Sequence, residues 1–185
     1  MIRRLGRASA VAMSGITAVI VMTTAPAYAA DVDTTGSSAY DGGVSSSDDV
    51  TFSGTGVVTC SLSTSGPAHV RRPSSSTVNF NITPSAATTC NATQPGISVQ
   101  ATLQKNGTNI YNAPKFSCQL CTGGKSQGST WSCNSSETAC KGTYRVRGVF
   151  TYTLSAAYIP TLLPSGCTLN ADTVTCVRYS NGIKV

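Results

Sequence analysis

Apolar and polar side chains alternate along most of the chain after residue 50, and a period of two is typical of β-strands with one buried face. Segment 96–112 gives the clearest signal, because every second residue from 97 to 103 is apolar and the pair Asn106-Gly107 predicts a tight hairpin turn. The 3.6-residue repeat of an amphipathic helix does not occur in this region. We expect four polar residues of this segment to face outward: Ser98, Gln100, Thr102 and Gln104.

Segment 142–156 is the longest strand candidate. Segment 50–60 predicts a first strand with a glycine bend, 76–83 another strand, and 166–180 a closing hairpin. About seven such strands predict an all-β fold, an antiparallel two-sheet β-sandwich. In segment 142–156 the alternation assigns Tyr144, Val146, Phe150, Tyr152 and Leu154 to the inward face, and Arg145, Arg147, Val149, Thr151 and Thr153 to the outward face.

Gly142 and Tyr144 open this strand with a spacing that resembles the sixth strand of immunoglobulin-like domains, where such a tyrosine forms the tyrosine corner. The chain departs from that family at two positions: Cys140 replaces its aspartate, and Val146 replaces its cysteine. The resemblance covers one strand and implies an immunoglobulin-like architecture. As a whole, the chain resembles small uncharacterised secreted β-sandwich proteins of actinobacteria, which implies no defined activity.

The first 29 residues have the features of a signal peptide. Three arginines in the first seven residues precede an uncharged apolar run, and Ala27-Tyr28-Ala29 fits a cleavage site. The apolar run is shorter than the ~20 residues that a membrane-spanning helix needs. We therefore expect cleavage after Ala29, a secreted, extracellular protein, and no membrane span once residues 1–29 are removed.

Charge is unevenly distributed along the remaining chain. Residues 30–49 carry five aspartates and no cation among Ser, Gly and Thr, which predicts a disordered acidic tail or propeptide before a domain at 50–185. That domain has ten Lys and Arg against Glu137 and Asp172, a balance of +8. An anionic cell-surface polymer or a secreted protein is the candidate partner. Nucleic acid is not expected, because no run of basic residues exceeds two.

Two pairs of arginines are candidate anion-binding residues. Arg145 and Arg147 stand two apart on the outward face of the predicted strand, about 7 Å from each other. Arg71 and Arg72 form a second basic spot, in a segment that reads as a loop. The alternative is that these side chains are ordinary solvated surface residues.

All eight cysteines follow the predicted cleavage site, and an even count in an exported chain favours disulfides. Within the cluster Cys118–Cys140, the spacing C-x₂-C-x₁₁-C-x₆-C lacks the second C-x₂-C of a zinc ribbon, and no helical pattern follows the first pair as in a redox centre. We therefore expect a disulfide-stapled loop and neither metal nor cofactor.

The expected pairing rests on hairpin symmetry. Cys167 and Cys176 lie symmetrically about the turn at 171–172, so they face each other across two strands. In the cluster, Cys121–Cys133 nested inside Cys118–Cys140 fits a hairpin, and the crossed arrangement stays open. Cys60–Cys90 then follows by elimination.

The sequence offers little for catalysis. His69 is the only histidine, no nucleophile elbow occurs, and a glycosidase would need two facing carboxylates where the domain has Glu137 and Asp172 alone. We therefore expect a non-enzymatic binding or structural protein that acts at or outside the cell surface. The alternative is a secreted protease inhibitor or antagonist that presents the stapled loop, because a preorganised loop binds at low entropic cost.

Overall fold

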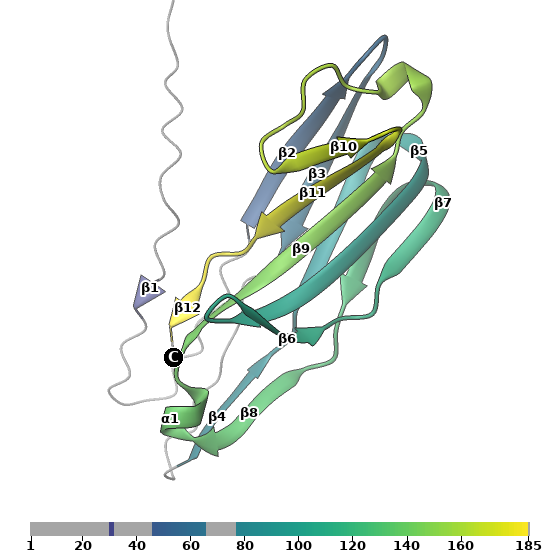
Figure 1. Ribbon diagram of the computed structural model, residues 1–185. Coiled ribbons are helices and arrows are strands. Elements are labelled where there is room, and N and C mark those ends of the chain that lie inside the picture. Colours follow the sequence, from purple (N-terminus) through teal and green to yellow (C-terminus); the bar gives the residue numbers. More distant parts are fainter. Residues whose placement is uncertain (1–29, 32–45, 66–76, 185) are drawn as a thin grey trace, which may run out of the picture.

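The computed structural model of the chain describes residues 30–31, 46–65 and 77–184. In these ranges the chain is mostly β-structure, and all strand pairs are antiparallel except β1–β12 (Figure 1). The antiparallel all-β class expected from the sequence is therefore confirmed. The elements are β1 (Ala30–Asp31), β2 (Ser46–Ser53), β3 (Val57–Thr64), β4 (Thr77–Ile82), β5 (Ser85–Lys105), β6 (Thr108–Asn112), β7 (Phe116–Gln127), β8 (Trp131–Ser136), α1 (Glu137–Cys140), β9 (Thr143–Thr153), η1 (Ala156–Tyr158), β10 (Cys167–Asn170), β11 (Thr173–Tyr179) and β12 (Ile183–Lys184).

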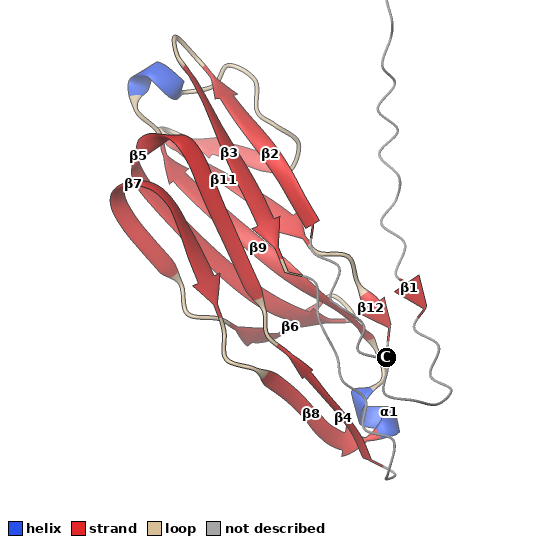
Figure 2. Cartoon of the chain, turned by 180° about the vertical axis from the view of Figure 1, so that it is seen from behind, coloured by secondary structure: helices blue, strands red, loops and turns tan. Residues whose placement is uncertain are grey.

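A long central strand, β5, joins two arms of one ten-stranded sheet. Its first part pairs with β3, which pairs with β2; we call β2, β3 and this part of β5 the β3 arm. Its second part pairs with β9 and β6, and β9 continues to β11 and β10; these strands form the β9 arm. Strand β7 follows β5 through both arms (Figure 2). The described residues thus form one curled sheet.

The expectation of two hydrogen-bonded sheets packed face to face is met only in part. The strand predicted to start at residue 96 instead begins at Ser85, and β5 runs on through Pro95 and Gly96. The pairing with β7 slips between Thr89 and Gln94. Such an irregularity bends a strand without ending it, so the sheet curls and stays continuous. Two strands, β4 and β8, pair with each other in a separate small sheet.

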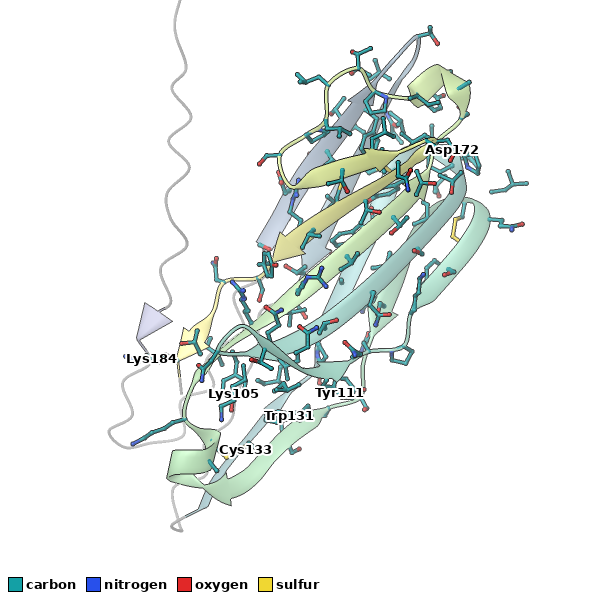
Figure 3. The ribbon with its side chains drawn as sticks, in the orientation of Figure 1. Lys105, Tyr111, Trp131, Cys133, Asp172 and Lys184 are labelled. Atoms are coloured by element: carbon teal, nitrogen blue, oxygen red, sulfur yellow. A yellow bond between two sulfur atoms is a disulfide. The ribbon has the colours of Figure 1, made fainter. Side chains whose placement is uncertain are left out.

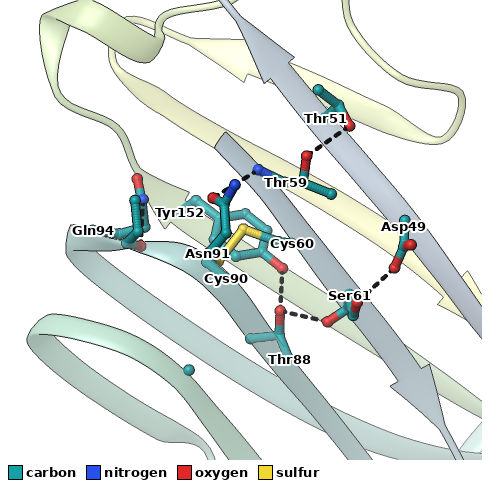
Figure 4. The surroundings of a disulfide bond; sticks show 12 residues. Asp49, Thr51, Thr59, Cys60, Ser61, Thr88, Cys90, Asn91, Gln94 and Tyr152 are labelled. Atoms are coloured by element: carbon teal, nitrogen blue, oxygen red, sulfur yellow. Dashed lines mark hydrogen bonds between the residues drawn. A yellow bond between two sulfur atoms is a disulfide. The ribbon is translucent and has the colours of Figure 1, made fainter. Parts of the chain in front are cut away.

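The core lies between the two arms. Every second residue of β9 is buried, as the alternation predicted, and Leu154 is buried directly after it. The rings of Phe52 on β2 and Tyr152 on β9 pack across the core with centroids 5.4 Å apart. The Tyr152 hydroxyl also lies 2.7 Å from the hydroxyl of Thr88, which donates to the carbonyl of Ser61 (Figure 4). These contacts join the arms.

The single strand expected at 50–60 is wrong, because the chain reverses direction there. Strands β2 and β3 form a hairpin with Ser53 opposite Val57. The turn packs tightly on η1: the Gly56 amide donates to the carbonyl of Ala157 at 2.6 Å, and a Cβ on Gly54 would lie 2.6 Å from the carbonyl oxygen of Ile159. Glycine is required here for close approach of two backbones.

The β2 strand begins at Ser46, four residues before the expected start of the domain. Its two aspartates have partners on neighbouring strands. Asp48 forms an ion pair of 2.8 Å with Arg178 on β11, and Asp49 accepts a 2.6 Å hydrogen bond from Ser61 on β3. The composition of residues 30–49 predicted disorder, because composition contains no information on contacts between aspartates and distant strands. The predicted signal peptide at 1–29 and residues 32–45 lie outside the described ranges.

All eight cysteines are paired. Cys60–Cys90 and Cys167–Cys176 each join directly opposed residues of neighbouring antiparallel strands, which confirms both expected bridges. The nested pairing in the cluster is wrong, because the bridges are Cys118–Cys121 and Cys133–Cys140. The cluster is not one hairpin: β7 belongs to the main sheet and β8 to the small one, so each pair closes locally.

The small sheet is attached to the main sheet at one end of the molecule, where α1 also lies (Figure 1). The ring of Trp131 on β8 packs 5.8 Å from that of Tyr144 on β9. The Tyr144 hydroxyl donates a 2.7 Å hydrogen bond to the carbonyl of Cys140 in α1. Asp172, in the β10–β11 turn, lies at the opposite end of the molecule (Figure 3).

Candidate anion-binding face

The outward side of β9 carries both arginines that the sequence predicted there. Arg145 and Arg147 are half-buried between neighbouring strands. Gln104 on β5 lies directly opposite Arg145. Arg147 lies opposite Thr102 on β5 and opposite Tyr179 on β11. The two guanidinium groups are thus surrounded by polar and aromatic side chains of the β9 arm. We call Arg145 and Arg147, together with their neighbours Gln104, Thr102 and Tyr179, the arginine face.

Arg145 is held in place by two contacts. Its Nε donates a 2.9 Å hydrogen bond to Oε1 of Gln104, and its Cζ lies 4.2 Å from the ring centroid of Tyr179. Gln104 is oriented in turn, because its Nε2 donates to Oδ1 of Asn109 on β6 at 2.8 Å. Hydrogen bonds and ring stacking that fix a guanidinium lower the entropy it loses on binding a ligand. Within the described part of the chain neither Nη group has a hydrogen-bond partner, so both can donate to an anion.

Neither arginine of this face is paired with a carboxylate in the described part of the chain. The ion pair at Asp48 uses Arg178, which lies on β11 with its side chain toward the other arm. A positive charge without an internal counter-ion attracts anions from solution. The arginine face therefore combines two positive charges with one guanidinium group that is fixed by its neighbours, and both arginines are half-buried.

Two residues expected at the solvent-facing surface are buried. Thr102 is 2% exposed and Gln104 is 6% exposed, although both lie on the outer side of β5. The β6 strand and Arg145 cover them: Thr102 donates to Oδ1 of Asn112 at 2.9 Å, and Gln104 lies between Arg145 and Asn109. Alternation with a period of two predicts which face of the sheet a residue lies on. It does not predict whether side chains of neighbouring strands cover that residue.

A shallow depression of about 610 Å³ opens on the same outer side of the β9 arm. Thr151 on β9 lies opposite Ser98 on β5, and Ser98 lies opposite Ser117 on β7. Five of its eight lining residues carry a hydroxyl or amide side chain, and its surface is polar and apolar in about equal parts. It shares the outward face of β9 with the two arginines, since its β9 residues are also odd-numbered. The depression is lined by Gly96, Ile97, Ser98, Ser117, Cys118, Gln119, Thr151 and Thr153.

Two tyrosines with raised pKa values, Tyr144 and Tyr152, lie on the opposite, inward side of β9. Burial raises the pKa of Tyr144 to about 12. Burial also raises the pKa of Tyr152, and this effect outweighs the hydrogen bond with Thr88 and the nearby charge of Arg178. Both hydroxyls therefore stay protonated at neutral pH. They contribute to the stability of the core and lie away from the arginine face.

The described residues contain no group of three or more His, Cys, Asp and Glu that could hold a metal ion. Asp172 and α1, which contains Glu137, lie at opposite ends of the molecule, so these positions do not form a facing pair (Figures 1 and 3). Arg71, Arg72 and His69 lie outside the described ranges.

No family model, curated protein or solved structure matches the chain. Within residues 30–31, 46–65 and 77–184, none of the helices is long and apolar enough to cross a membrane. The four disulfides and this observation are compatible with a secreted protein.

Sequence reasoning found the two arginines and missed the residues that orient them. The alternation predicts that Gln104 faces outward but not its contact with Arg145, and it gives no indication that Tyr179 reaches the same guanidinium group. The period-two alternation of β11 does indicate that Tyr179 faces outward, because Tyr179 is two residues after Val177 on the same side of the strand. The rest depends on the register between β5, β9 and β11, which no local pattern encodes.

Proposed function

We propose that the chain is a secreted, non-enzymatic binding protein that holds an anionic ligand on the arginine face, at or outside the cell surface. The observation that carries the proposal is Arg145, which is fixed between Gln104 and Tyr179 and has no carboxylate partner in the described ranges. Arg147 lies beside it and doubles the charge. Secretion is supported by the signal-peptide pattern of residues 1–29 and by four disulfides.

We propose an immunoglobulin-like relationship for the same fold, with the two arms as its two layers. The support is the hydrogen bond from Tyr144 to the carbonyl of Cys140, four residues upstream, since a tyrosine corner makes a bond of this kind. The replacement of the family's cysteine by Val146 distinguishes this chain from antibody domains.

The anion-binding proposal is tested by charge removal. We expect the variant Arg145→Gln/Arg147→Gln to elute from an anionic matrix at lower salt, with a weaker dependence of retention on ionic strength. Each charge-assisted contact is worth roughly tenfold in affinity. The matched control is Lys125→Gln, an exposed cation on β7 outside the arginine face. If Arg147→Gln and Lys125→Gln change retention equally, net charge explains binding and the face does not.

A second candidate function is supported by Leu120. This side chain is 78% exposed and its residue has a φ of 50°, inside the loop closed by Cys118–Cys121. A fixed, exposed apolar side chain suits docking to a partner protein, such as a secreted protease. We expect Leu120→Ser to abolish any inhibition found in a protease panel and to leave anion retention unchanged. Absence of inhibition across the panel contradicts this second candidate.

A further inference from the structure

The outer side of the β9 arm continues from the arginine face into the hydroxyl-lined depression. Thr151 follows Arg147 by four residues on β9, which places it roughly 14 Å further along the strand. Between them lies Val149, opposite Val177 on β11 and Gln100 on β5. The surface therefore presents two charges at one end, a small apolar strip in the middle and a hydroxyl-lined hollow beyond it.

This order of groups matches one kind of ligand. A small anion would contact the arginines alone and leave the depression unused. Hydroxyl and amide side chains both donate and accept hydrogen bonds, so the depression suits a ligand that is itself rich in hydroxyl groups. The half-buried Val149 and Val177 suit the C–H face of a sugar ring. No acidic side chain lines the depression to repel a negatively charged chain.

We propose that the ligand is an acidic polysaccharide, which is bound as an extended chain along the outer side of the β9 arm. Its carboxylate groups contact Arg145 and Arg147, and neighbouring sugar hydroxyls occupy the depression at Ser98, Ser117 and Thr151. This assignment rests on the anion-binding function proposed above and names the ligand class for the same surface. It requires that charge and hydroxyl contacts contribute separately to affinity.

The test compares two polyanions that differ in hydroxyl content. Polygalacturonate carries carboxylates on sugar rings, polyacrylate carries carboxylates on a hydrocarbon chain, and neutral dextran serves as the uncharged reference. We expect the wild-type protein to bind polygalacturonate at least about tenfold more tightly than polyacrylate of similar length, and dextran weakly, because only the first engages both regions. Equal affinity for the two polyanions overturns the assignment.

Two variants separate the contributions. Thr151→Val/Ser117→Ala removes two hydroxyls from the depression at nearly constant volume, and neither hydroxyl has a described partner within the chain. We expect it to weaken polygalacturonate binding about fivefold or more and to leave polyacrylate binding unchanged. The matched control is Thr89→Val, an exposed threonine on the β3 arm. Melting temperature is measured for each variant to verify folding.

The outcomes distinguish the two proposals. If Thr151→Val/Ser117→Ala behaves like Thr89→Val while Arg145→Gln/Arg147→Gln loses binding to both polyanions, the polysaccharide assignment fails and anion binding stands. If the arginine variant retains full affinity for both polyanions, the proposed function fails as well. Shorter galacturonate oligomers should bind progressively more weakly, and a monomer as tight as the polymer would also contradict the extended binding mode.

Discussion

The hydroxyl of Tyr144 donates a 2.7 Å hydrogen bond to the carbonyl of Cys140, and the sulfur of the same cysteine is bonded to Cys133. Cys140 is fully buried and receives one link from each sheet. Tyr144 belongs to the main sheet and Cys133 to the small one. These two links attach the β4–β8 sheet and α1 to the body of the protein.

We expect Tyr144→Ala to cost more than two other substitutions on β9. Tyr144→Ala should lower the free energy of unfolding by about 3–5 kcal/mol, because it removes a buried ring. Tyr144→Phe should cost about 1–2 kcal/mol through the lost hydrogen bond. Arg145→Ala should cost about 1–2 kcal/mol, because it leaves Oε1 of the buried Gln104 without its donor. Urea denaturation measures all three, and equal costs for Tyr144→Ala and Arg145→Ala would contradict the register.

The local disulfides of the cluster predict a simple peptide map. Trypsin cleaves after Lys115, Lys125 and Lys141, and Lys125 separates Cys121 from Cys133. Digestion of the unfolded, unreduced protein should yield peptides 116–125 and 126–141 unconnected, each with an internal bridge. Mass spectrometry with and without reductant detects this. Nested or crossed pairing would keep the two peptides linked until reduction.

Stability should fall at high pH because of the buried tyrosines. Burial raises the pKa of Tyr144 to about 12 and also raises that of Tyr152, whereas an unfolded tyrosine titrates near 10. Above pH 10 the unfolded state releases protons that the native state retains, so the free energy of unfolding decreases as pH rises toward the folded pKa. Below pH 10 this contribution is fully present. Denaturant titrations at pH 8 and pH 11 should show the loss.

The variant Tyr152→Phe supplies the control for that measurement. It has no phenol to titrate at this position, so its free energy of unfolding should fall less between pH 8 and pH 11 than that of the wild type. An identical fall in both proteins would assign the pH dependence to other groups.

Two glycines should respond differently to substitution. Gly107 has a φ of 82° and no atom within 4 Å of a new Cβ, so Gly107→Ala should cost about 1–2 kcal/mol through backbone strain alone. Gly107→Asn should recover much of that loss, because asparagine tolerates the left-handed region. At Gly54 a Cβ meets the carbonyl of Ile159, so both Gly54→Ala and Gly54→Asn should destabilise the β2–β3 turn. Recovery by asparagine at Gly54 would contradict the close approach.

Features governed by neighbouring residues were predictable from the sequence. The burial of Tyr144 and Val146 follows from period two within one strand, and Cys167–Cys176 follows from the symmetry of one hairpin. Features governed by the assignment of strands to sheets were not. Cys118 and Cys140 lie in one cysteine cluster of the sequence, but Cys118 is on β7 of the main sheet and Cys140 is in α1, and each is bonded to a nearer cysteine.

The candidate site also combines features that the local sequence predicts with contacts that it does not predict. The outward direction of Arg145 was readable from its own strand. Its contacts with Gln104 and Tyr179 join segments 41 and 34 positions away in the chain, and a shift of one residue in either pairing would remove them. Register is set by the packed core as a whole, so these contacts appear only in the three-dimensional structure.

The passage of β5 through both arms affects how the protein reaches its native state. Leu103 pairs with Val146, and Cys60 pairs with Cys90, so each arm requires segments that are distant along the chain to meet on the same strand. Folds dominated by such nonlocal pairing form on the millisecond-to-second scale. Because both arms share β5, an amide in the β3 arm and one in the β9 arm should exchange with deuterium through the same global opening.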